Sequence, residues 1–121
     1  MSVRVHPLLL KRGKPGVKFE DAEDFEIQAI FVSDHIAVHE SIDPLADDWA
    51  VTHVPTGMVL TKAASLVAAF EAANALEHLD VDWSFSHPSD RDRITKEQLN
   101  LVRFIRAFAT AGDLESLRGA S

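Results

Sequence analysis

The sequence contains no cysteine, which excludes disulfide bonds, thiolate metal ligands and cysteine nucleophiles. A chain without disulfides is typical of a reducing compartment, so we expect a cytoplasmic location. Long hydrophobic runs are missing as well. No stretch approaches the roughly 20 apolar residues that a membrane span needs, and the run Leu8 to Leu10 is shorter than a signal-peptide core. We therefore expect no association with a membrane.

Catalytic signatures are also missing. The five glycines are scattered at positions 13, 16, 57, 112 and 119, which excludes a glycine-rich loop that could cradle a phosphate. The sequence has neither a His-Glu-x-x-His metal motif nor a nucleophile elbow. These absences favour a non-enzymatic protein that needs no cofactor.

Lysine and arginine are absent from residues 19–61, although the whole chain contains 12 of them. Residues 1–18 hold basic residues and no acidic one, and the net charge of the chain is −7. Such segregation of charge creates a field that selects partners of opposite sign. The acidic residues of the 19–61 segment are Glu20, Asp21, Glu23, Asp24, Glu26, Asp34, Glu40, Asp43, Asp47 and Asp48.

Two interpretations of this acidic segment stay open from the sequence. Charged residues at exposed strand positions keep sheet edges from aggregating, so the segment can be an ordinary solvated face. Carboxylates on a rigid sheet can instead imitate the charge array of a nucleic-acid backbone and compete for a basic groove. Direct nucleic-acid binding is not expected, because the basic segment lacks interleaved aromatic residues. Its members are Arg4, Lys11, Arg12, Lys14 and Lys18.

Hydrophobic periodicity predicts an α+β domain. Phe25, Ile27, Ala29 and Phe31 recur with the period of a strand. We expect strands at 3–10, 25–33, 36–42, 49–54 and 58–61, an extended segment at 80–86, and helices at 65–79 and 95–112. Because the strands precede the helices, the order predicts an antiparallel sheet of about four strands with two helices packed on one face.

The length of 121 residues predicts one domain. Within it we expect a basic N-terminal strand or arm at 1–18 and an acidic core domain at 19–112. Residues 113–121 follow Gly112, a natural helix stop, and are expected to form a flexible tail.

Histidines provide the first candidate sites. His35 and His39 share one face of a predicted strand, where strand rise separates them by roughly 13 Å. This distance is too great for two ligands of one zinc ion, so we expect no metal site. The alternative is a pair of partly exposed strand histidines beside carboxylates.

A second candidate site centres on His53, next to the predicted hairpin turn at Pro55 to Gly57. His53 shares a strand face with Trp49 and could act as a general base. Asp80 and Asp82 share another extended face, where paired carboxylates could hold magnesium or transfer protons. A pocket formed by these residues would make the protein a small enzyme or a ligand-binding protein.

Two segments carry a resemblance. The hairpin Trp49-Ala-Val-Thr-His-Val-Pro-Thr-Gly57, followed by Phe70-Glu-Ala-Ala-Asn-Ala-Leu76, resembles small proteins of phages and other mobile elements. Small acidic single domains among them are often inhibitors of host defence, anti-CRISPR proteins included. The resemblance implies a non-enzymatic inhibitor in the cytoplasm of a bacterial host, and it carries no functional residue across.

The leading prediction is therefore an acidic interaction protein that blocks a basic surface of a nucleic-acid-handling complex such as CRISPR–Cas. The ten acidic residues would meet arginine and lysine side chains of this partner. One alternative is the pocket around His53, and another is a self-associating regulatory module that forms a homodimer.

Overall fold

The computed structural model describes residues 4–12, 16–42, 46–87 and 94–120 of the chain. Within these ranges the fold is α+β, as predicted, with five strands and three α-helices. The expected count of about four strands and two helices is one strand and one helix short. The elements are β1 Arg4–Arg12, a short 3-10 helix η1 Phe19–Asp21, β2 Glu23–Phe31, β3 Ile36–Glu40, β4 Trp49–His53, β5 Met58–Ala63, α1 Leu66–His78, α2 Lys96–Ala111 and α3 Leu114–Ala120.

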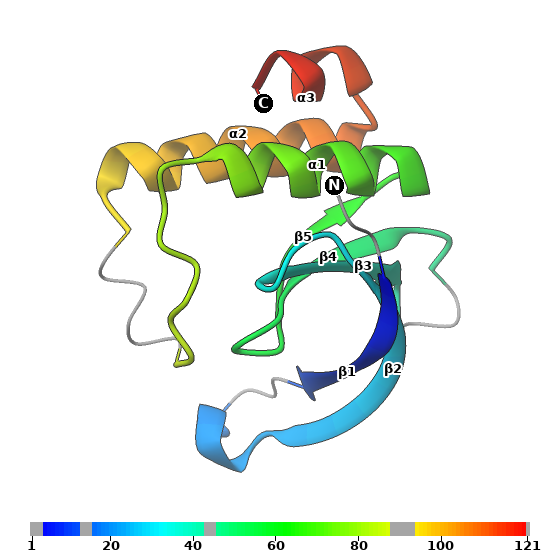
Figure 1. Cartoon of the computed structure of the whole chain (residues 1–121), viewed down its shortest axis with the longest axis vertical. Coiled ribbons are helices and arrows are strands. Elements are labelled where there is room, and N and C mark those ends of the chain that lie inside the picture. The colour runs from blue at the N-terminus through cyan, green and yellow to red at the C-terminus, as the bar shows by residue number, and fades with distance from the viewer. Residues whose placement is uncertain (1–3, 13–15, 43–45, 88–93, 121) are drawn as a thin grey trace.

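The strands form one antiparallel sheet in chain order, β1-β2-β3-β4-β5 (Figure 1). β1 and β2 pair along all nine residues of each strand. β2 and β3 pair only where Ile30 faces Val38 and Phe31 faces Ala37. Beyond these two pairs β2 leaves β3 and curves away together with β1 (Figure 1). We refer to these two strands as the β1–β2 ribbon.

The far end of the ribbon touches the turn between β4 and β5. The backbone N–H of Lys11 donates to the carbonyl of Gly57 at 3.0 Å. Gly57 has a φ of +70°, and a Cβ at this position would lie 2.6 Å from the carbonyl oxygen of Leu9. Glycine is needed here for both reasons, since other residues avoid this φ and no side-chain atom fits.

Helices α1 and α2 cover one face of the sheet, and α3 packs on the other side of the helix pair (Figure 1). The Oγ of Ser65 accepts a hydrogen bond from the N–H of Ala68, so the expected N-cap of α1 is confirmed. α1 presents small side chains to the sheet and so approaches it closely. The buried alanines of this helix are Ala68, Ala69, Ala72, Ala73 and Ala75.

α2 begins and ends as the sequence predicts. Thr95 and Gln98 form the capping box, and Gly112 ends the helix in the left-handed conformation with a φ of 71°. The core between the helices and the sheet contains Ile36, Val38, Val51, Leu76, Val102 and Ile105, all buried, and Leu117 of α3 belongs to the same buried cluster.

The C-terminal residues differ from the flexible tail that we expected. Asp113 caps a short helix, α3, because its carboxylate accepts hydrogen bonds from the N–H and the hydroxyl of Ser116. These bonds lower the pKa of Asp113. Leu117 is fully buried against the other helices, and Arg118 forms an ion pair with Glu71 of α1 at 3.1 Å. Burial of Leu117 holds this segment in place.

The segment expected to be extended at 80–86 lies between α1 and α2 and forms no strand, and its chain turns at Trp83 and Ser84. The alternation of burial is nevertheless correct, because Trp83 and Phe85 are buried and Asp82 is exposed. Asp82 accepts hydrogen bonds from the N–H and the hydroxyl of Ser84, which turns the chain. The indole N–H of Trp83 donates to the carbonyl of Leu76. Side-chain burial thus holds this segment without strand pairing.

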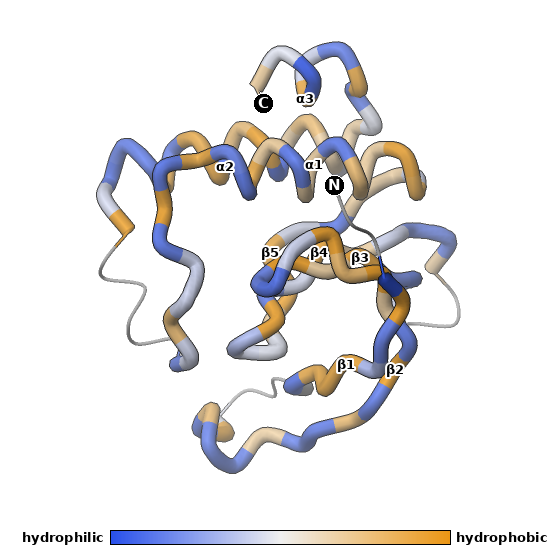
Figure 2. The backbone as a smooth tube through the Cα atoms, in the orientation of Figure 1, coloured by the Kyte–Doolittle hydropathy of each residue, from blue (hydrophilic) through white to orange (hydrophobic). Residues whose placement is uncertain are grey.

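A second, smaller core lies on the face of the sheet away from the helices. It is enclosed by the β1–β2 ribbon and contains Leu8, Leu10, Ala29 and Ala37 as its buried members. Hydrophobic and hydrophilic residues alternate along much of β2 (Figure 2), as a strand with one buried face requires. Among the described residues, no helix combines the length and the apolar character needed to span a membrane.

Candidate functional site

The first acidic group lies on η1 and the first half of β2. Its five members are exposed on one continuous stretch of ordered backbone: Glu20, Asp21, Glu23, Asp24 and Glu26. Strand geometry turns Phe25 and Ile27 toward the small core, so the carboxylates of Asp24 and Glu26 point to the outer face of the ribbon. The sequence pattern therefore places this row of charge on the solvent side.

The basic N-terminal segment is strand β1 of the sheet from residue 4 to residue 12, and it neutralises part of the acidic charge. Lys11 forms an ion pair with Asp24, and Arg4 forms one with Asp34, each at 2.9 Å. The Arg4–Asp34 pair is exposed, and such pairs stabilise a fold by only about 0–1 kcal/mol, whereas Lys11 is 21% exposed in its pair with Asp24. Within the described part of the chain, no ion pair joins a basic side chain to Asp21, Glu23, Glu26, Glu40 or Asp47.

Glu20 has a histidine partner. Nε2 of His87 lies 2.6 Å from Oε1 of Glu20. This hydrogen bond is the main reason why the pKa of Glu20 is lowered. The contact fastens the segment before α2 to η1, next to the edge-on packing of His87 against Phe19.

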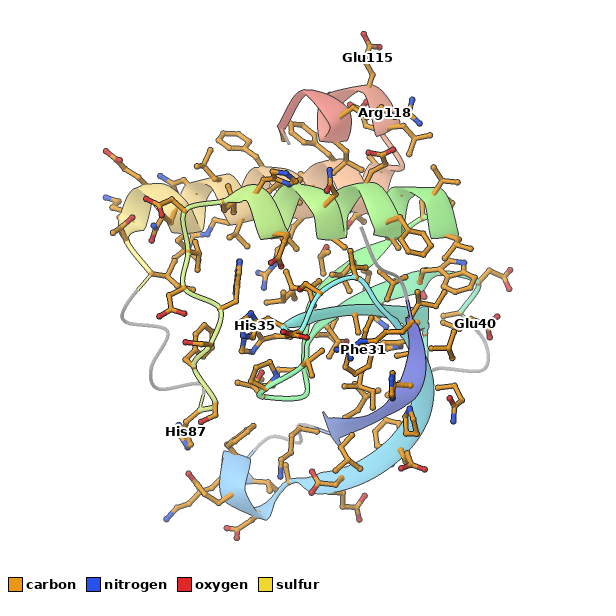
Figure 3. All side chains as sticks on the ribbon, viewed as in Figure 1. Phe31, His35, Glu40, His87, Glu115 and Arg118 are labelled. Carbon is orange, nitrogen blue, oxygen red and sulfur yellow. The ribbon has the colours of Figure 1, made fainter. Side chains whose placement is uncertain are left out.

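The second acidic group lies where β3 ends and β4 begins. Glu40 and Asp47 are exposed and Asp48 is half-buried, whereas Asp43 lies outside the described residues. Figure 3 shows Glu40 at the right of the view and His87, the partner of Glu20, at the lower left. The predicted site residues thus form two separate groups. Asp34, in the turn between β2 and β3, belongs to neither.

Asp48 differs from the other acidic residues. Its Oδ1 is buried and accepts no hydrogen bond from the described part of the chain. A buried carboxylate oxygen without a donor is costly, by roughly 1–3 kcal/mol.

A cleft opens between the two acidic groups, where β2 leaves β3. It has a volume of about 430 Å³. Its walls include Ile27 and Gln28 of β2, Glu40 of β3, Ile42, and Trp49 of β4. We refer to it as the β2–β3 gap. The sequence did not indicate it, because the pattern of β2 as a half-buried strand is the same whether or not β3 pairs with it.

His39 lies beside the gap and is buried. Its Nδ1 donates to the carbonyl of Glu40 at 2.7 Å, since a carbonyl can only accept, and its Nε2 accepts from the hydroxyl of Thr52 at 2.7 Å. Burial lowers the pKa of His39, which favours the neutral ring. The described residues include no group of three or more histidine, aspartate or glutamate side chains arranged to hold a metal ion.

His53 is also buried and hydrogen-bonded at both ring nitrogens. Nε2 donates to the carbonyl of Trp83 at 2.6 Å, and Nδ1 accepts from the hydroxyl of Thr56 at 2.8 Å. The ring stacks on Phe85 with centroids 4.3 Å apart, and burial lowers the pKa of His53. With both nitrogens engaged, this histidine is positioned as a structural group and not as a general base.

A small pocket of about 120 Å³ adjoins His53, with Trp83, Leu99 and Arg106 in its walls. We expected a pocket formed by His53, Trp49, Asp80 and Asp82, and of these only His53 lines this pocket. Trp49 lines the β2–β3 gap instead, and Asp80 and Asp82 do not line the pocket. Thr56, a hydrogen-bonding partner of His53, was missed, although its place in the hairpin turn three residues on could have indicated it.

The ribbon also exposes apolar side chains that no sequence pattern singled out. Val5 and Leu9 of β1 are 65% and 59% exposed. Leu9 pairs across the ribbon with Glu26, so an apolar row runs beside the acidic row. Exposed apolar residues rimmed by charge are typical of protein–protein contact surfaces. No protein-family profile, curated protein or solved structure matches this chain, so the geometry of these surfaces is the basis for assigning a function.

Proposed function

We propose that the protein is a non-enzymatic interaction protein whose sheet side binds a basic surface of a nucleic-acid-handling partner. The observation that supports it is the exposed acidic row of η1 and β2 on ordered backbone. Three of its five carboxylates, those of Asp21, Glu23 and Glu26, have no ion-pair partner among the described residues. These are the charges that we expect arginine and lysine side chains of a partner to meet.

The neighbouring apolar row strengthens this proposal. A solvated face that only prevents aggregation would not place Leu9 beside Glu26. Apolar contact supplies affinity, and carboxylates supply orientation and a fast approach to a cationic surface. An inhibitor of the anti-CRISPR type would use both to occupy the groove in which the partner holds nucleic acid.

Two matched variants test the acidic row. The first carries Asp21→Asn, Glu23→Gln and Glu26→Gln, and the second carries Asp80→Asn, Glu97→Gln and Glu115→Gln on the exposed helix side. Both lose the same formal charge. The immobilised protein is used to capture partners from bacterial lysate at low and high salt, with added DNA as competitor. We expect captured nucleic-acid-binding proteins to be released by DNA and lost from the first variant alone.

Equal losses from both variants would show that only net charge matters and would contradict a specific acidic surface. The anti-CRISPR role has its own assay, the plaquing of a targeted phage on bacteria with an active CRISPR–Cas system. Expression of the protein should raise the plaquing efficiency, and expression of the first variant should not. No change with the wild-type chain would remove this role from the proposal.

Self-association is a second candidate, favoured by the outer face of α2. Phe104 is 59% exposed and stacks on Phe108 with ring centroids 6.4 Å apart, and Leu101 is 48% exposed. Analytical ultracentrifugation over a range of concentrations, with Phe104→Gln as control, measures it. A dimer that the substitution dissociates would support this second candidate.

A further inference from the structure

The β2–β3 gap is a place where two neighbouring strands of the sheet are not paired. β2 pairs with β3 only as far as Ile30 and Val38. Continuing the same register would place Gln28 opposite Glu40, but in the described part of the chain the two strands do not pair there. The cleft between them, about 430 Å³, has the size of an ordinary ligand pocket.

The backbone groups that face the gap follow from strand alternation. The N–H of Val32 donates to the carbonyl of Ile36 across the β2–β3 boundary, so alternate residues of β2, including Gln28, direct their backbone groups to this side. On β3, the N–H of Ser41 donates to the carbonyl of Asp48 on the other side. Glu40 and Ile42 therefore direct their backbone groups toward β2. A strand placed in the gap would meet donors and acceptors on both sides.

The residues that line the β2–β3 gap indicate which kind of ligand would fit it. Ile27, Ile42 and Trp49 are apolar, and Ile42 is 42% exposed. Glu40 is the acidic residue in the wall, and it is exposed. Lys62 is engaged with Ser41, to whose hydroxyl it donates at 2.7 Å. The carboxylate of Glu40 is negative and complements a cation.

We propose that an extended segment of the partner, with lysine or arginine alternating with apolar residues, adds to the sheet as a strand between β2 and β3. This inference rests on the proposed binding of a basic partner and specifies how the partner is held. The added strand would pair with Gln28 on one side and with Glu40 and Ile42 on the other. Its basic side chains would reach the carboxylate of Glu40.

A labelled peptide of about eight residues with alternating lysine and valine is the probe, since strands have about this length. Two matched peptides accompany it, one with N-methyl groups on alternate residues and one with glutamate in place of lysine. We expect the first peptide to bind by fluorescence anisotropy, and each of the others to bind at least about tenfold more weakly. Amide exchange at Gln28, Glu40 and Ile42 should slow when the first peptide is bound.

Gln28→Pro tests the backbone contact on the protein side. It removes an N–H that faces the gap and no hydrogen bond between β1 and β2, and Gln28→Ala is the control that keeps the N–H. We expect about a tenfold loss of peptide affinity for the proline variant and little change for alanine. Glu40→Gln leaves the backbone intact and should weaken binding even if the proline variant does not fold.

Equal binding of the N-methylated peptide, or exchange protection elsewhere, would overturn strand addition. Dimerisation that competes with the peptide would also overturn it, because a second copy would then fill the gap. If the peptide does not bind while the Asp21/Glu23/Glu26 variant still loses its captured partners, this inference fails and the proposed function stands. If captured partners are indifferent to that variant, the proposed function fails independently of the peptide result.

Discussion

The helix-covered half of the molecule and the β1–β2 ribbon are held by very different amounts of packing. β3, β4 and β5 bury one face under α1 and α2 in a continuous core. The ribbon encloses only Leu8, Leu10, Ala29 and Ala37 as buried side chains among the described residues. It is joined to the rest of the sheet by two residue pairs at one end and by the Lys11–Gly57 bond at the other. The helical half therefore supplies most of the stability, and the ribbon, with the acidic and apolar rows, belongs to the less stable part of the fold.

The strongest test of this contrast compares one leucine in each half. Leu76 of α1 is fully buried under the sheet, and Leu8 of β1 is 3% exposed in the small core. We expect Leu76→Ala to lower the free energy of unfolding by about 2–5 kcal/mol. Leu8→Ala should cost less, because the ribbon can loosen while the helical half stays folded. Urea unfolding measures the totals, and amide exchange shows where protection is lost.

Uniform loss of protection across both halves in Leu8→Ala would mean that the ribbon unfolds only with the whole domain. The contrast would then be wrong, and the ribbon would be as integral to the fold as α1.

The second test disrupts the contact between the far end of the β1–β2 ribbon and the turn between β4 and β5. Gly57→Ala forces a Cβ to within 2.6 Å of the Leu9 carbonyl at a φ of +70°. Gly16→Ala is the matched control, since Gly16 has a φ of +79° but a Cβ added there would have no atom within 4 Å. We expect a loss of about 2–3 kcal/mol for Gly57→Ala and about 1 kcal/mol for Gly16→Ala, from thermal or urea unfolding. Equal losses would show that strain in φ alone matters and that the ribbon accommodates the extra atom.

The third test uses pH, because both buried histidines lie on strands of the helix-covered half, His39 on β3 and His53 on β4. Burial lowers the pKa of both below 6.5. The unfolded chain takes up these protons as the pH falls through 6.5, whereas the folded chain does not. Stability is therefore full above pH 6.5 and falls below it, by up to about 1.4 kcal/mol per pH unit for each histidine.

Urea unfolding at about pH 7.5 and 5.5 measures this dependence, over a range where most carboxylates stay ionised. His39→Gln and His53→Gln should each remove part of the slope, and the exposed His78→Gln should not. A slope that survives in the double variant would assign the pH dependence to other groups.

Local signals predicted much of the fold because they act over a few residues. Ser65, the Thr95–Gln98 capping box and Gly112 set the ends of α1 and α2 as expected. The alternation in Phe25–Phe31 set the inner face of β2. α3 was not predicted, because Gly112 ends α2 without ending the ordered chain. The sequence signal for α3 was Asp113 followed by Leu114 and Leu117. It indicates a helix only once α1 and α2 are known to form a surface on which these leucines can pack.

The candidate site was less predictable, because it depends on contacts between distant residues. The acidic residues of β2 were expected on an exposed face, and they are exposed. The predicted acidic site residues form two separate groups because β2 diverges from β3. The spacing of residues in the sequence does not show where two strands diverge. The basic partners of Asp34 and Asp24 on β1 likewise follow from the register of β1 against β2. The alternation of Asp82 and Trp83 correctly predicted that Trp83 is buried. It could not show that this segment does not pair with a strand.

The order of the strands has a consequence for how the chain is made. Every strand pairs with the one synthesised just before it, so the sheet can grow at the ribosome one strand at a time. The Lys11–Gly57 contact, in contrast, must wait for a distant residue. Until α1 and α2 emerge, however, the face carrying Ile36, Val38 and Val51 has no cover, and the nascent chain is most exposed to misassociation in that interval.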